Sequence, residues 1–74
     1  MAREIVEVPL TGKIISVDVK PGDEVEEGDT ICTLESMKME NPIIAPVDGT
    51  IVQLGVTVDQ VVKPGETIAV IECQ

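Results

Sequence analysis

The sequence contains no histidine, phenylalanine, tyrosine or tryptophan. Without histidine, the chain cannot build Ser-His-Asp or Cys-His catalytic arrangements, and it has no side chain that ordinarily titrates near neutrality. Without aromatic rings, it also lacks the stacking surfaces on which single-stranded nucleic acid binds. These absences point away from acid–base catalysis at neutral pH and from nucleic-acid recognition.

Basic side chains are scarce, with 5 Lys and Arg against 14 Asp and Glu, which gives a formal net charge of −9. This charge repels phosphate groups, so neither nucleic acid nor an anionic membrane surface is an expected partner. No apolar run approaches the length of a membrane span, and the start, Met-Ala-Arg-Glu, has no apolar signal segment. We therefore expect a cytoplasmic protein with no direct membrane insertion.

Cysteine is also rare, with Cys32 and Cys73 as the two thiols. Small secreted folds normally have four or more cysteines, so we expect both thiols to be reduced and structural. Binding of a metal by this pair would need two further soft ligands that the chain does not have. We therefore predict no metal site and no catalytic residue.

What is abundant is β-branched aliphatic residues, with 21 Val and Ile against three Leu. Six Gly and five Pro divide the chain into short pieces, so helices of ordinary length are not expected. The segment Lys20-Pro21-Gly22-Asp23 predicts a turn, because proline fixes φ at one corner and glycine accepts a positive φ at the next. Strands are expected over residues 4–8, 13–20, 30–35, 41–45, 50–56 and 67–72.

An internal repeat appears when the sequence is compared with itself at an offset of 37 residues, without a gap. Nine of the 27 positions from 9 to 35 are identical in 46–72, including Pro9/Pro46, Gly12/Gly49 and Glu35/Glu72. A half of this size is too small to hold a core, so the halves should exchange strands or face each other. We predict one domain over 1–74, an all-β flattened antiparallel barrel with a quasi-two-fold axis.

The repeat also singles out Lys38. Glu35 corresponds to Glu72 near the end of the chain, whereas the first half continues through Ser36-Met37-Lys38-Met39-Glu40 into the second. Residues 35–40 should therefore form a hairpin opposite the termini. An ordinary explanation is a solvated turn lysine with methionines packed into the core, but two methionines around a turn lysine favour a surface contacted by other proteins.

The stretch Leu34-Glu35-Ser36-Met37-Lys38-Met39-Glu40-Asn41 resembles the attachment motif of biotin carboxyl carrier (biotinyl) domains, whose usual form is Glu-Ala-Met-Lys-Met. The resemblance covers nearly the whole chain, including 8–12, the turn 19–23 and 45–49. Ser36 stands where alanine is commoner, Asp59-Gln60 replaces the Gly-Asp of the repeat, and no inserted thumb precedes the motif. The resemblance implies two four-stranded sheets related by a quasi-two-fold axis.

By this resemblance, Lys38 is the residue to which biotin is joined through an amide. A biotin protein ligase would attach it, and the arm would then move a carboxyl group between a biotin carboxylase and a carboxyltransferase or decarboxylase, so the chain is a carrier without catalytic residues of its own. Met37 and Met39 would position the hairpin for these enzymes. Glu35, Ser36 and Glu40 are further recognition candidates, although the glutamates could equally be solubilising charge.

Three alternatives remain open from the residues. A lipoyl domain attaches lipoic acid at the same hairpin position, but typically reads Asp-Lys-Ala. The chain could instead be an unmodified structural or assembly module. The acidic run 23–29 could be taken for a calcium loop, but it lacks the ligand spacing of one. The sequence does not name the carboxyl acceptor or the parent enzyme.

Overall fold

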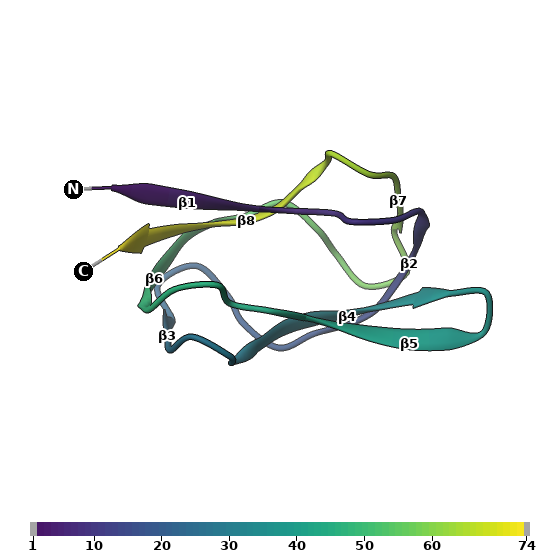
Figure 1. The fold of residues 1–74 in the computed structure, drawn as a ribbon, viewed down its shortest axis with the longest axis horizontal. Coiled ribbons are helices and arrows are strands. Elements are labelled where there is room, and N and C mark those ends of the chain that lie inside the picture. Colours follow the sequence, from purple (N-terminus) through teal and green to yellow (C-terminus); the bar gives the residue numbers. More distant parts are fainter. Residues whose placement is uncertain (1, 74) are drawn as a thin grey trace.

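The computed structural model describes residues 2–73, so the first and last residues of the expected 1–74 domain lie outside it. It contains β1 (Arg3–Glu7), β2 (Gly12–Val17), β3 (Glu24–Val25), β4 (Thr30–Ser36), β5 (Met39–Ile44), β6 (Gly49–Leu54), β7 (Val61–Val62) and β8 (Thr67–Cys73). These strands form two four-stranded antiparallel sheets, in the orders β1-β8-β6-β3 and β5-β4-β2-β7 (Figure 1). No helix occurs among residues 2–73, and none is available to cross a membrane.

The two sheets are related by the sequence repeat. Adding 37 to the residue numbers moves β2 onto β6, β3 onto β7 and β4 onto β8, and it moves β1 onto the last five residues of β5. If each strand of the sheet β1-β8-β6-β3 is replaced by its equivalent in the other half, the order becomes β5-β4-β2-β7, which is the order of the second sheet. The predicted fold class, with its internal two-fold relation, is therefore confirmed.

Each half contributes two strands to the other half's sheet, since β1 and β3 lie with β6 and β8, and β5 and β7 lie with β2 and β4. The two-residue strand β3, from the first half, pairs with β6, and β7, from the second half, pairs with β2. Neither half could therefore keep its sheet if the other were removed. The structure thus shows the strand exchange that a 37-residue half needs in order to enclose a core.

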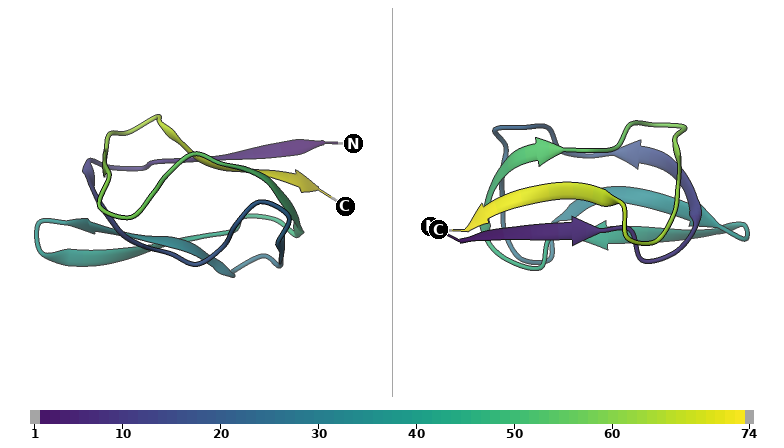
Figure 2. Two further views of the ribbon diagram at one scale, coloured as in Figure 1. Left: turned by 180° about the vertical axis from the view of Figure 1, so that it is seen from behind. Right: turned by 90° about the horizontal axis from the view of Figure 1, so that it is seen from above.

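The core lies between the two sheets and is aliphatic. Its largest fully buried side chains are Ile14, Ile31, Leu34, Ile51, Ile68, Ile71, Val62 and Cys32. Burial of each large aliphatic side chain contributes about 1.5–3 kcal/mol. The molecule is elongated, measuring 36 × 19 × 16 Å, with the β4–β5 hairpin at one end of the long axis and the termini at the other (Figure 2).

Two of the expected features of the turns are found. Gly22 has φ 99°, as the turn over residues 20–23 requires, and Asp59 has φ 75° at the equivalent place in the second half. Asp59 therefore keeps the left-handed backbone that Gly22 provides, as aspartate can more readily than most residues.

The strand predictions needed two corrections. The strands expected over 13–20 and 50–56 end at Val17 and Leu54, because the chain leaves the sheet there and turns at residues 20–23 and 57–60. The strands β3 and β7 were not predicted, because each is only two residues long and is defined by its partner in the other half.

Gly12 and Gly49 occupy equivalent places where two strands approach closely. A Cβ at Gly12 would overlap the carbonyl oxygen of Glu35, and a Cβ at Gly49 would overlap that of Glu72. We expect Gly12→Ala and Gly49→Ala each to lower the free energy of unfolding by about 1–3 kcal/mol, because the strand backbones must move apart. Urea unfolding measures this, with Thr11→Ala, at an exposed neighbour, as control. Losses below about 0.5 kcal/mol in both glycine variants would contradict the packing argument.

Candidate functional site

The β4–β5 hairpin ends in a two-residue turn made by Met37 and Lys38. Ser36 pairs with Met39 and Glu35 with Glu40 across the hairpin, which leaves Met37 and Lys38 as the only unpaired residues between the strands. Their φ angles are 53° and 64°. Two successive positive φ values are the signature of a type I′ turn, whose twist matches that of the flanking strands.

This turn is built from residues that do not favour it. Asn-Gly is the preferred pair, and a residue with an ordinary side chain in the left-handed region costs about 1–2 kcal/mol. Met37 and Lys38 therefore occupy an unfavourable backbone that the paired strands must hold. Strained backbone of this kind clusters at functional sites, so it makes Met37 and Lys38 candidates for a functional role.

The side chains at the tip point into solvent. Met37 is 92% exposed and Met39 is 68% exposed, so the alternative in which the methionines pack into the core is wrong. Lys38 is also exposed and makes no ion pair with any residue from 2 to 73. Its amine is therefore free to enter the active site of another protein, at the end of the molecule remote from the termini (Figure 1).

Asn41 braces the hairpin from the inner side and was not predicted as a site residue. Its half-buried side-chain amide donates to the carbonyl oxygen of Met39 at 3.2 Å and lies 3.5 Å from that of Leu34 on the facing strand. The equivalent residue in the other half, Glu4, is exposed. The sequence did hold a signal, since the charged Glu4 of the repeat is replaced by an amide three residues after Lys38.

An acidic pair flanks the turn. Glu35 and Glu40 are exposed and directly opposite each other on β4 and β5. At the equivalent place in the other sheet, Glu72 is opposite Arg3, and their charged groups lie 3.6 Å apart. Like charges in direct cross-strand pairs are destabilising, so the hairpin presents an acidic pair that the repeated half replaces with an ion pair.

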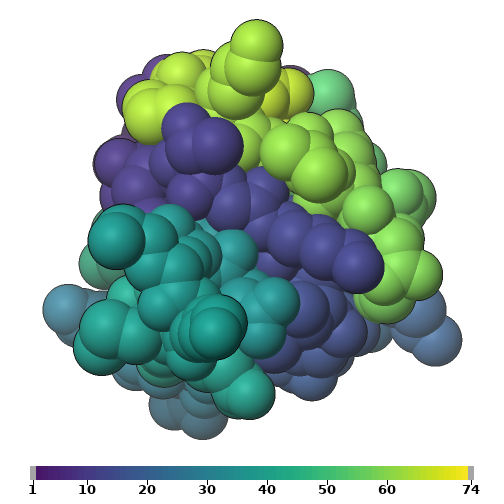
Figure 3. All heavy atoms as spheres, turned by 90° about the vertical axis from the view of Figure 1, so that its right-hand side faces the viewer, coloured from purple at the N-terminus to yellow at the C-terminus, as the bar shows by residue number. Residues whose placement is uncertain are grey.

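All the predicted site residues thus lie on one hairpin. Glu35, Met37, Lys38, Met39 and Glu40 are exposed, whereas Ser36 is half-buried. Figure 1 shows the hairpin extending beyond the rest of the molecule, and the space-filling view onto this end shows its atoms, in teal, on the exposed face (Figure 3).

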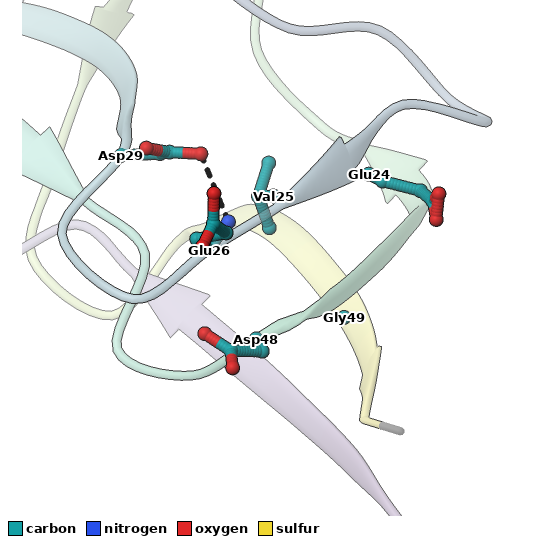
Figure 4. Close-up of a pocket in the computed structure, with 6 residues that line it drawn as sticks. All are labelled: Glu24, Val25, Glu26, Asp29, Asp48 and Gly49. Carbon is teal, nitrogen blue, oxygen red and sulfur yellow. Dashed lines mark hydrogen bonds between the residues drawn. The ribbon is translucent and has the colours of Figure 1, made fainter.

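The acidic run that was considered as a calcium loop borders a cavity of about 340 Å³ at the other end of the barrel, lined by Glu24, Val25, Glu26, Asp29, Asp48 and Gly49 (Figure 4). Asp29 accepts a hydrogen bond from the Glu26 amide at 2.8 Å, and Asp48 accepts one from the Glu27 amide at 2.7 Å. These carboxylates therefore hold backbone turns. Across the described residues, no His, Cys, Asp and Glu side chains form a group that could hold a metal.

The two thiols differ in their surroundings. Cys32 is fully buried, and Cys73 is half-buried. Burial, with a smaller contribution from the negative charge of Asp18, raises the pKa of the Cys32 thiol from 9.0 to about 11. Because the thiolate is the reactive form, the raised pKa makes Cys32 an unreactive core residue. Neither Cys32 nor Cys73 forms a disulfide.

Comparison with known proteins gives a consistent result. The family model described as "Biotin-requiring enzyme" matches residues 4–71. The chain is 40% identical over 68 residues to the "Biotinylated protein TB7.3 homolog" of Mycobacterium leprae, covering 92% of this chain and 96% of that protein. It is 39% identical over 64 residues to mitochondrial pyruvate carboxylase of Mus musculus, covering 86% of this chain and 5% of the enzyme.

The structural comparison agrees. A single-chain, multi-domain long-chain acyl-CoA carboxylase superposes with a TM-score of 0.91 and 28% identity, covering 97% of this chain and 7% of that enzyme. The chain thus spans nearly all of the mycobacterial protein but only a small part of each of these two carboxylases.

The Asn41 brace gives a prediction. Asn41→Ala should remove the bond to Met39 and reduce hairpin stability by about 0.5–1.5 kcal/mol, so the backbone amides of the hairpin should exchange with deuterium about threefold to tenfold faster. Hydrogen exchange followed by NMR measures this. Glu4→Ala, at the equivalent place, is the control and should leave hairpin exchange unchanged. Equal exchange in Asn41→Ala and the parent would show that Asn41 does not brace the hairpin.

Proposed function

The chain belongs to the family of biotin-requiring enzyme domains, as a non-catalytic biotin carrier domain, and from this premise we propose that Lys38 is the residue that bears biotin. The observation that carries this assignment is an exposed lysine amine at the tip of a hairpin whose strands are held in the barrel. Lys13, Lys20 and Lys63 are also exposed, but none lies at the tip of a projecting hairpin.

The attachment step needs little from this chain. A biotin protein ligase would present biotin as its adenylate, and the lysine nitrogen would attack the acyl carbon. An amide bond forms, the acyl–phosphate bond breaks and AMP leaves, while the ligase takes the proton of the amine. The hairpin fits this step because it exposes the amine of Lys38, which makes no ion pair with any residue from 2 to 73.

Biotin, once bound, supplies a ureido ring that accepts and donates a carboxyl group. We propose that a biotin carboxylase loads this group and that a carboxyltransferase or decarboxylase removes it. The relatives support these partners, since they include mitochondrial carboxylases and, at 59% identity over 39 residues, the gamma subunit of glutaconyl-CoA decarboxylase from Acidaminococcus fermentans. The carrier's part is tethering, which raises the effective concentration of the carboxyl group at each active site.

We propose that these enzymes recognise the domain by contacting the residues around Lys38. Met37 and Met39 provide soft, adaptable apolar contacts on both sides of the lysine, and their exposure supports this role. Glu35 and Glu40 add an acidic pair suited to basic side chains of a partner. Ser36 is small enough to let a partner approach the turn.

We further propose that residues 1–74 act as one unit, with 9–35 and 46–72 as its repeated parts and 35–40 as the attachment hairpin. The shared core and the exchanged strands support this division. A cytoplasmic location remains a prediction from the sequence. The lipoyl alternative is not favoured, since the relatives named above are biotinylated or carboxylating and decarboxylating proteins.

Lys38→Arg should abolish labelling by a biotin protein ligase, because the guanidinium is not a nucleophile toward the adenylate at neutral pH. Streptavidin blotting after co-expression with the ligase measures this. The melting temperature should stay within about 2 °C of the parent, since the side chain is exposed. Lys63→Arg is the control and should be labelled normally. Biotin retained in Lys38→Arg would disprove the assignment.

Glu40→Arg should give Glu35 the ion partner that Glu72 has in Arg3. We expect stability to rise by about 0.2–1 kcal/mol and the rate of biotinylation at low ligase concentration to fall about fivefold, because the acidic pair is lost. The matched control is Arg3→Glu, which creates the like-charge pair at the far end. Arg3→Glu should lower the stability of the domain, but the ligase should biotinylate it at the parent rate. Equal labelling rates in the parent, Glu40→Arg and Arg3→Glu would exclude recognition of the acidic pair.

A further inference from the structure

The repeat places two loops of the same backbone at opposite ends of the barrel. The hairpin-side loop is residues 57–61, and the terminus-side loop is residues 20–24. In the first, the Gln60 amide donates to the Thr57 carbonyl at 3.2 Å, and in the second, the Asp23 amide donates to the Lys20 carbonyl at 3.0 Å. Side chains also match, since Gln60 and Asp23 each accept from the amide three residues earlier, at 3.0 Å in both loops. The two loops therefore share the same backbone hydrogen bonds although their sequences differ.

The hairpin-side loop lacks the proline and glycine that favour the turn in the terminus-side loop. Val58 and Asp59 stand where the other loop has Pro21 and Gly22, although Asp59 must hold φ 75°. Proline and glycine at compatible positions are each worth about 0.4–1 kcal/mol or more of stability. Between these two loops, the loss falls on the one at the end of the molecule that bears Lys38.

The replacing side chains are presented to solvent. Val58 is 52% exposed and Val61 is 67% exposed, and Asp59 makes an exposed ion pair with Lys13 at 3.6 Å. At the other end, the residue equivalent to Val61 is the charged Glu24. The two exposed valines therefore have no counterpart on the terminus-side loop.

The hairpin-side loop continues the surface of the attachment hairpin. Val61 pairs with Lys13, and Lys13 pairs on its other side with Glu35 at the base of the hairpin. Figure 3 shows the same relation, with the green atoms near residue 60 and the teal hairpin on one face, and purple atoms of the segment near residue 13 between them. The views from behind and above also place this loop at the hairpin end (Figure 2).

We propose that the hairpin-side loop is a second docking surface for the biotin protein ligase, an inference that rests on the function proposed above. The ligase is the enzyme that must come closest to this domain, because it acts on the bare lysine, whereas later enzymes act at the end of the longer biotinyl arm. Its contact surface would offer an apolar patch to Val58 and Val61 and basic groups to Glu35 and Glu40. The loop thus sets affinity for the ligase, and the hairpin supplies the reacting amine.

The test exchanges the two loop sequences. The hairpin-side graft is Thr57→Lys, Val58→Pro, Asp59→Gly, Gln60→Asp and Val61→Glu, which copies a turn that this barrel already forms and leaves the net charge unchanged. We expect a melting temperature equal to or a few degrees above the parent. The KM of the ligase for the carrier should rise about tenfold with kcat changed less than about twofold, because Lys38 and its hairpin are untouched.

The control is the reverse graft on the terminus-side loop, with Lys20→Thr, Pro21→Val, Gly22→Asp, Asp23→Gln and Glu24→Val. It should lose stability but keep the parent KM. A milder pair, Val58→Ser with Val61→Ser, tests the same surface if a graft does not fold, and its KM should rise about threefold to tenfold.

A parent-like KM in the hairpin-side variants would overturn the docking surface while leaving Lys38 as the attachment site. An equal rise of KM in both grafts would also overturn the docking surface. If the grafts impair only carboxyl transfer by a biotin carboxylase, the loop would be assigned to that later enzyme instead of the ligase. If the parent itself takes no biotin on Lys38, the proposed function and the docking surface both fail.

Discussion

The exchange of short strands between the two halves is the constraint on which the rest of the structure depends. A 37-residue half cannot bury its own valines and isoleucines, so β1 and β3 complete the sheet of the second half, and β5 and β7 complete that of the first. The buried residues of both halves then form one aliphatic core with no aromatic side chain. Because every sheet contains strands from both halves, loss of either half removes support from the hairpin that bears Lys38.

Duplication also provides an internal reference, because each position has a counterpart in the same molecule. The core residues Ile14, Ile31 and Val25 have Ile51, Ile68 and Val62 as their equivalents, and Gly12 has Gly49. Some departures distinguish the two ends of the long axis, because Arg3, Glu4 and Gly22 have Glu40, Asn41 and Asp59 as their counterparts at the hairpin end. The identical core positions serve packing that both halves share, and the differences at the hairpin end are the features on which the proposed recognition by partner enzymes rests.

Much of this could be predicted from the sequence. The repeat fixed the symmetry and the place of the hairpin, since the second half stops where the first continues through Lys38. Other features depend on contacts between distant residues. Strands β3 and β7 are defined by their partners, and the need for glycine at position 12 comes from the Glu35 carbonyl. The hydrogen bonds of Asn41 and the exposure of Val58 and Val61 are seen only in the structure, although the repeat already distinguishes Asn41 from Glu4.

The central claim is that this barrel presents one lysine for biotin, and intact mass spectrometry with fragmentation tests it most directly. The protein would be co-expressed with a biotin protein ligase and, separately, with a lipoate ligase. The account predicts one biotinyl group, located on Lys38, and no lipoyl group. A lipoyl group on Lys38 without biotin, biotin on Lys13, Lys20 or Lys63, or a folded protein that neither ligase modifies would contradict it.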